Sequence, residues 1–101
     1  MAQFDVYRNL SLSSCKRAPY FVEVQGNYCD VRSTCVIIPL VKPGSFTPAA
    51  VLNPTIMIDE DTYILSTSEI TAVSRSKLGL CVGSIKYYHN DIIQAIDRLL
   101  Q

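Results

Sequence analysis

Short strand-like segments at close intervals, followed by a single helical pattern, constrain the fold of this chain most. Alternation of polar and apolar residues predicts a first strand at residues 3–7 and a second at 19–25. In the second strand the neighbours Phe21 and Val22 are both apolar, which indicates partial burial of both faces. The polar, serine-rich residues 8–18 between these strands are expected to form a mobile loop.

An apolar, β-branched run at residues 34–38 predicts a central strand, which Pro39 is expected to end or to place at an edge. Residues 55–58 and 62–65 predict a hairpin whose tip is the acidic segment 59–61. A solvated tip is preferred over a calcium site, because calcium loops need more ligands and a glycine at set spacing. Two further short strands are expected, at residues 70–73 and 78–82.

The only helical pattern covers residues 89–100 and runs into the last residue. Ser84 is a plausible N-cap for this helix. The end of such a helix leaves carbonyl groups that either dock on another protein or fray. Several strands and one helix imply a single antiparallel α+β domain over residues 1–101. The apolar stripe of the helix is expected to contain Ile85, Ile92, Ala95, Ile96, Leu99 and Leu100.

The charge balance argues against direct nucleic-acid binding. Nine basic and nine acidic residues give a net charge of zero, and no basic stripe is visible. Hydrophobic residues make up 49% of the chain, a surplus that a homo-oligomer would cover. No run approaches the roughly 18 apolar residues of a membrane span, and the first residues do not resemble a signal peptide. A cytoplasmic protein without a membrane segment is therefore expected.

The reactive side chains predict neither a metal site, a cofactor site nor a catalytic centre. The four cysteines are irregularly spaced and are expected to be reduced thiols, with Cys29 and Cys81 buried as small apolar residues. His89, the only histidine, is expected on the surface of the helix. Tyr28 and Cys29 lie in a polar bend, where the tyrosine either packs on the core or contacts a partner.

Several short segments carry a resemblance to a known family. They are Gln3–Tyr7, Phe21–Gln25, Val36–Leu40, Pro54–Asp59 and Asn90–Ile92, followed by Ala95 and Ile96. Their order and spacing, over nearly the whole chain, resemble those of the CcdB family, the toxins of Ccd toxin–antitoxin systems.

This resemblance implies an SH3-like barrel of the CcdB/MazF type, with a small extra sheet and one C-terminal helix. It also implies a homodimer that is not an enzyme. Members of the family bind the A subunit of DNA gyrase and trap its cleaved DNA complex, and a CcdA-type antitoxin releases them. The toxin–antitoxin complex represses its own operon, with the antitoxin contacting the DNA, so this chain would reach DNA only indirectly.

The resemblance also implies site residues. The family contacts gyrase through a Trp-Gly-Ile after the helix, and Gln101 stands where the tryptophan is expected, with no Gly and Ile following. Gln offers less contact area than an aromatic anchor, so a weakened gyrase contact is expected. The implied gyrase-binding residues are Tyr28, Cys29, Asp97, Leu100 and Gln101.

Basic residues near the expected antitoxin tail, which tends to be acidic in this family, are Lys16, Arg17 and Lys42. Two alternatives to gyrase poisoning stay open. One is a homologue that binds the antitoxin without poisoning gyrase. The other is a MazF-like ribonuclease, for which the candidate residues would be Arg32, Arg75 and His89.

Overall fold

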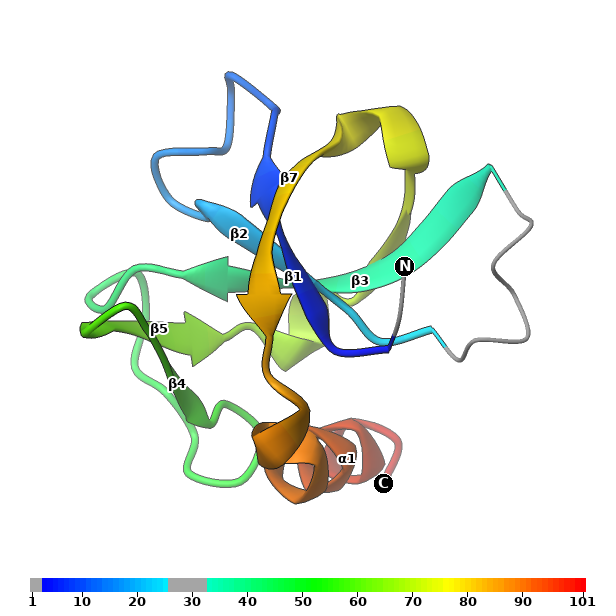
Figure 1. Ribbon diagram of the computed structural model, residues 1–101. Helices are drawn as coiled ribbons and strands as arrows, with labels where there is room; N and C mark the ends of the chain where they lie inside the picture. Colours follow the sequence, from blue (N-terminus) through cyan, green and yellow to red (C-terminus); the bar gives the residue numbers. More distant parts are fainter. Residues whose placement is uncertain (1–2, 26–32) are drawn as a thin grey trace.

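A computed structural model describes residues 3–25 and 33–101, which form one curled antiparallel sheet and a helix beneath it (Figure 1). The sheet has the order β4-β5-β3-β2-β1-β7, and β6 pairs with β3 beside this path. This arrangement confirms the predicted α+β class and is consistent with an SH3-like barrel. The elements are β1 (Asp5–Asn9), β2 (Tyr20–Glu23), β3 (Thr34–Val41), β4 (Thr55–Ile58), β5 (Asp61–Leu65), η2 (Thr67–Glu69), β6 (Thr71–Ser74), η3 (Arg75–Lys77), β7 (Leu78–Ser84), η4 (Lys86–Tyr88) and α1 (His89–Leu99).

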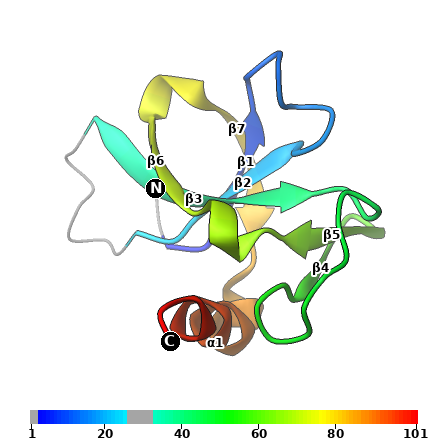
Figure 2. The same ribbon diagram turned by 180° about the vertical axis from the view of Figure 1, so that it is seen from behind.

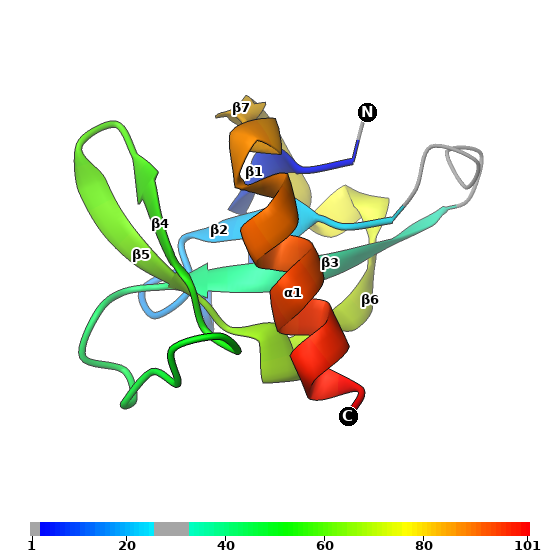
Figure 3. The ribbon, with the colours of Figure 1, turned by 90° about the horizontal axis from the view of Figure 1, so that it is seen from below.

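Both faces of the sheet are buried, because α1 covers one face and the curl of the sheet encloses the other. Figure 3 shows α1 lying across β2 and β3. Side chains alternate between the faces along each strand. The helix face contains Val6, Val22, Ile38, Leu40, Ile92 and Ala95. The barrel face contains the buried residues Tyr7, Phe21, Glu23, Cys35 and Ile37. The adjacent residues Phe21 and Val22 therefore belong to different faces, which confirms the predicted two-sided burial.

Pro39 does not end the central strand, so the first of the two outcomes predicted for it is wrong. β3 continues to Val41, and Pro39 pairs with Phe21 of β2. On its other side β3 pairs with β6 up to Ile37 and with β5 from Leu40 onward. Pro39 lies in the interval where the partner changes, and its carbonyl accepts a hydrogen bond from the Ser66 N–H (3.0 Å). The missing proline N–H therefore disrupts no strand pairing at this position.

The predicted acidic hairpin is confirmed and is closed by a two-residue turn. Ile58 pairs with Asp61, and the two residues between them, Asp59 and Glu60, have φ values of 50° and 73°. Two successive positive φ values are typical of the type I′ turn, whose twist matches that of the flanking strands. The turn holds the Asp59 side chain at the end of β4.

The first strand begins two residues later than predicted, because Phe4 has a positive φ of 69° and cannot continue a ladder. Phe4 instead joins the sheet to the helix. Its N–H donates to the Glu23 carbonyl, and its carbonyl accepts from the Ile85 N–H. Its ring lies edge-on to the His89 ring, with centroids 5.2 Å apart.

The loop after β1 is organised by one buried side chain. The Asn9 amide donates to Ser14 Oγ (3.0 Å) and to the Ala18 carbonyl (2.8 Å), and it accepts from the Ser11 N–H (2.8 Å). The expectation of a mobile loop did not anticipate these internal hydrogen bonds.

Two expectations for the helix are wrong. Ser84 is the last residue of β7, and Tyr88 occupies the N-cap position without a side-chain hydrogen bond. A 3-10 turn precedes the helix, in which the Tyr88 N–H donates to the Ile85 carbonyl. Leu100 follows the helix and is 77% exposed, so it does not widen the buried stripe. Ile92 and Ala95 are buried, as the stripe predicts.

Candidate protein-binding site

The end of α1 presents an exposed surface that contains three of the predicted gyrase-binding residues. Asp97, Leu100 and Gln101 are all exposed, and Leu100 is among the most exposed apolar side chains described. Asp97 and Gln101 border a depression of about 290 Å³. The other residues that line this depression are Val51, Gln94 and Arg98. We call this region the helix-end surface, with Leu100 included.

The helix-end surface follows from the amphipathic pattern of α1. Burial of Ile92 and Ala95 against the sheet turns Gln94, Asp97 and Arg98 toward solvent. The last turn is closed by the Leu100 N–H, which donates to the Ile96 and Asp97 carbonyls. Arg98 Nη1 donates to Gln101 Oε1 at 3.4 Å. The helix-end surface therefore combines two charged side chains, Asp97 and Arg98, with the exposed apolar side chain of Leu100.

Val51 is a member of this surface that the sequence did not reveal. It is 42% exposed and lies in the segment between β3 and β4. Asn53 holds that segment, since its side chain accepts from the Ala49 N–H and donates to the Leu65 carbonyl. No spacing pattern relates Val51 to α1. Tyr28 and Cys29, the other predicted gyrase-binding residues, lie outside the described residues.

The predicted antitoxin-binding residues lie at the junction of the β1–β2 loop and the end of β3. The Lys42 N–H donates to the Arg17 carbonyl at 2.9 Å, so the structure brings these two residues together. Lys16 is exposed and directly precedes Arg17 in the chain. Lys42 also borders a depression of about 490 Å³. Its other lining residues are Pro43, Asp61, Thr62 and Tyr63.

Arg17 makes an ion pair that the sequence did not predict. Both terminal nitrogens of its guanidinium donate to the carboxylate of Glu69 in η2, and Ser66 Oγ donates to the same carboxylate. The hydrogen bonds from Arg17 lower the pKa of Glu69, and the same pair raises the pKa of Arg17. An acidic partner that uses Arg17 must therefore compete with Glu69.

The barrel face contains ionisable groups that are packed rather than reactive. Glu23 is fully buried, with Arg75 Nη2 at 3.9 Å and the Tyr7 hydroxyl donating at 3.5 Å. Burial raises the pKa of the Cys35 thiol to about 11, and the nearby Glu23 charge adds to this effect. Burial likewise raises the pKa of Tyr7. Both groups stay protonated at neutral pH, so neither is an activated nucleophile. Cys81 is exposed, so its predicted burial is wrong.

The two described ribonuclease candidates are not brought together. Arg75 lies in η3 and pairs with Glu23 on the barrel face, whereas His89 begins α1 and packs on Phe4. η3 and α1 lie at opposite ends of the molecule in Figures 1 and 2. Arg32 lies outside the described residues.

Neither a metal-binding cluster nor a membrane-spanning helix occurs in the described parts of the chain, residues 3–25 and 33–101. No three His, Cys, Asp or Glu side chains there are grouped closely enough to hold a metal ion. No helix within these parts has the length and apolar character needed to cross a bilayer.

Comparisons with known proteins identify the family. No curated protein matches the chain. The solved structures that share its fold include an endoribonuclease in complex with its cognate antitoxin and a second endoribonuclease, both from Mycobacterial species. The first has a TM-score of 0.78 and 16% identity, over 99% of this chain and 94% of that one. The second has a TM-score of 0.74 and 17% identity, over 99% and 90%. The family model described as CcdB protein matches residues 3–101, and the chain therefore belongs to the CcdB family of toxins of toxin–antitoxin systems.

Proposed function

We propose that this toxin binds the A subunit of DNA gyrase through the helix-end surface and traps the cleaved gyrase–DNA complex. The observation that carries the proposal is the gathering of Asp97, Leu100 and Gln101 on one exposed surface, in a chain that belongs to the CcdB family. The exposed Leu100 side chain offers apolar contact area, and Asp97 and Arg98 offer charges that fix the orientation of a partner.

The gyrase contact of this chain is expected to be weaker than is usual in its family. Large aromatic anchors supply much of the affinity of small interfaces, and position 101 carries Gln. This residue supports the alternative that the chain binds an antitoxin without poisoning gyrase. The two functions differ in one measurable step, which is the accumulation of cleaved DNA.

The test is a gyrase cleavage assay with the purified full chain and supercoiled plasmid. Linear DNA is expected after protein denaturation, and Leu100→Asp and Asp97→Lys are each expected to reduce it. Asn90→Ala, an exposed change at the other end of the same helix, is the matched control and should leave the yield unchanged. Absence of linear DNA, together with no binding to the gyrase A subunit, would refute gyrase poisoning and leave the alternative.

We also infer that an acidic antitoxin segment binds beside Lys16, Arg17 and Lys42. The hydrogen bond from Lys42 to Arg17 and the exposure of all three side chains support this inference. Lys42→Glu is expected to weaken binding of a synthetic acidic tail, with Lys86→Glu in η4 as the control. Glu69→Gln should strengthen binding of the tail, because the Glu69 carboxylate then no longer competes with the carboxylates of the tail for Arg17. Equal affinity in all variants would exclude this site.

The proposed action is binding without chemical change, in a homodimer and in the cytoplasm, where gyrase meets its DNA. Control of the operon would then depend on DNA contacts of the antitoxin. The solved endoribonucleases share only the fold with this chain, and the separation of Arg75 from His89 argues against a joint catalytic role. Purified RNA should stay intact with the toxin. Cleavage that Arg75→Ala or His89→Ala abolishes would overturn the non-enzymatic proposal.

A further inference from the structure

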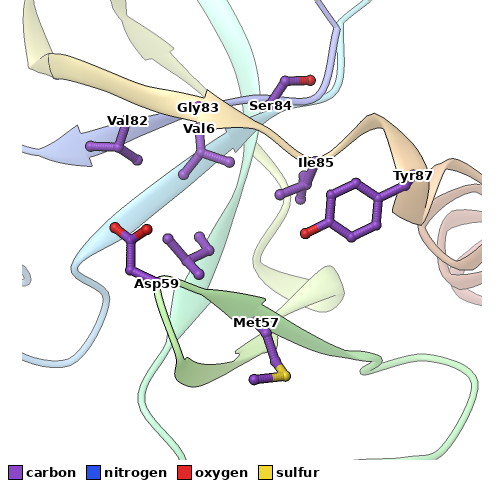
Figure 4. A pocket seen from close by; sticks show the side chains of 9 residues that line it. Val6, Met57, Asp59, Val82, Gly83, Ser84, Ile85 and Tyr87 are labelled. Atoms are coloured by element: carbon purple, nitrogen blue, oxygen red, sulfur yellow. The ribbon is translucent and has the colours of Figure 1, made fainter.

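A pocket of about 150 Å³ lies where the two ends of the sheet approach each other, away from the helix-end surface (Figure 4). β4 and β7 are the first and last strands of the sheet order, and residues of both line the pocket. Cavities of about this volume hold a molecule the size of benzene, so one side chain of a partner would fit. We call it the seam pocket. Its lining residues are Val6, Met57, Ile58, Asp59, Val82, Gly83, Ser84, Ile85 and Tyr87.

The inner part of the seam pocket is apolar. Val6 and Ile85 are buried, and Ile58 and Val82 are partly buried against the same core. Val82 is the additional residue of a β-bulge, because Val6 pairs with Gly83 while Tyr7 pairs with Cys81. Bulges redirect side chains out of the regular alternation, and in Figure 4 Val82 faces the space between β7 and β4.

The rim of the seam pocket is polar and acidic. In Figure 4 the Asp59 carboxylate points toward Val82, and the Tyr87 hydroxyl points into the same space from η4. Tyr87 is 77% exposed, although it is aromatic. The turn holds Asp59 in a left-handed conformation, and the Met57 N–H, which donates to the Tyr88 hydroxyl at 3.2 Å, ties the hairpin to η4. Asp59 on the hairpin and Tyr87 on η4 therefore belong to two segments that this hydrogen bond joins.

We propose that the seam pocket binds a lysine or arginine side chain presented by an extended segment of a partner protein. A long basic side chain places methylene groups on apolar surface while its charged end stays at the rim. Here the stem would lie on Val6 and Val82, and the cation would meet the Asp59 carboxylate and donate to the Tyr87 hydroxyl oxygen. β7 is the last strand of the sheet order, and a terminal strand can accept an added strand, which favours an extended segment. The Met57 N–H of β4 is already used by Tyr88.

This partner is chemically different from the proposed acidic antitoxin segment. Asp59, Glu60 and Asp61 follow one another at the hairpin tip, so this end of the sheet attracts basic segments. None of the three proposed antitoxin-binding residues, Lys16, Arg17 and Lys42, lines the seam pocket. Lys42 borders a separate depression, which Asp61 also lines. The inference does not depend on gyrase poisoning.

The probes are three synthetic peptides, acetyl-Thr-Val-X-Val-Thr-amide, in which X is lysine, norleucine or glutamate. Backbone amide shifts of the full-length protein are recorded by NMR during titration to about 1 mM peptide, where binding free energies near 4 kcal/mol become measurable. The lysine peptide should shift the amides of Met57–Asp59 and Val82–Ile85. The norleucine peptide should bind more weakly, and the glutamate peptide should produce no shifts there.

Asp59→Asn should lower the affinity for the lysine peptide about fivefold, which is the upper range for an exposed charge pair. Glu60→Gln is the matched control, because it removes a neighbouring charge outside the pocket lining, and it should change the affinity less than about twofold. Equal shifts with lysine and glutamate peptides, or no shifts at the highest concentration, would refute the proposal. If Met57→Lys instead converts a dimer into a monomer, a second copy covers this face, and the proposal is wrong.

Discussion

The two faces of the sheet are both buried, but they are filled with different chemistry. The helix face is apolar, with Val22, Ile38 and Ile92 in contact across the strands and α1. The barrel face places Phe21 and Ile37 beside a fully buried carboxylate, Glu23, and its partner Arg75. Adjacent residues of β2 and β3 point to opposite faces, so the same two strands contribute to both cores. The two cores stabilise the fold through different interactions.

Arg75→Ala tests the polar core and is expected to have the largest effect, a loss of about 4 kcal/mol in the free energy of unfolding. Removing one partner leaves a buried charge without its counter-ion, which costs more than the pair itself contributes. Urea unfolding at neutral pH measures the loss. In the Arg75→Ala background, Glu23→Gln should cost little or restore stability. A loss below about 1 kcal/mol would show that the two faces do not differ in this way.

Ile92→Ala tests the apolar core and is expected to cost about 3 kcal/mol, through lost burial and the cavity that remains. Thermal or urea unfolding measures the effect. Gln94→Ala, an exposed change two residues away on the same helix, should stay within about 0.5 kcal/mol. Similar losses for both variants would mean that α1 does not pack on the sheet as described.

Glu69→Gln tests an ion pair outside both cores, and its expected cost is less than about 1 kcal/mol, because both partners are more than two-fifths exposed. The pKa of Glu69 is lowered from 4.5 in the folded state. Its contribution is therefore fully present above pH 4.5 and is lost as the pH falls through the folded-state pKa. Unfolding curves of the wild type and Glu69→Gln should converge in acid. A constant difference down to pH 2 would contradict the ion pair.

Cysteine labelling distinguishes the buried barrel face from the exposed surface by the reactivity of their thiols, without a substitution that could change the stability. With iodoacetamide at about pH 8, Cys81 should react in the native protein, because it is exposed. Cys35 should react only after unfolding, since it is buried and the pKa of its thiol is raised to about 11. Peptide mass spectrometry distinguishes the two. Native labelling of Cys35 at the rate of Cys81 would show that the barrel face is open to solvent.

Local patterns predicted most of the fold. The hairpin around Asp59 and Glu60, the two-sided strand at Phe21 and Val22, and the helix with Ile92 inside all follow from periodicity and turn chemistry. The errors have two kinds of cause. Pro39 is accommodated by a tertiary arrangement, because β3 changes partner beside it. Leu100 is exposed for a local reason, because the helix has already ended.

The candidate site was only partly predictable. Asp97 and Gln101 were identified by resemblance to the family, and their proximity follows from helical spacing. Val51 joins them from a loop, and Glu69 reaches Arg17 across 52 residues of chain. Neither contact can be predicted from residue spacing, because the two residues of each pair lie in different elements and no helical or strand period relates them.

Residue spacing is enough to predict the class of the fold, the alternation that separates the two cores and the amphipathic helix, because backbone geometry translates spacing directly into faces. It does not predict which ionisable groups are buried together or where the two edge strands meet. Those outcomes depend on how the curled sheet brings together segments that lie far apart in the sequence, such as β1 with β7 and β3 with β6.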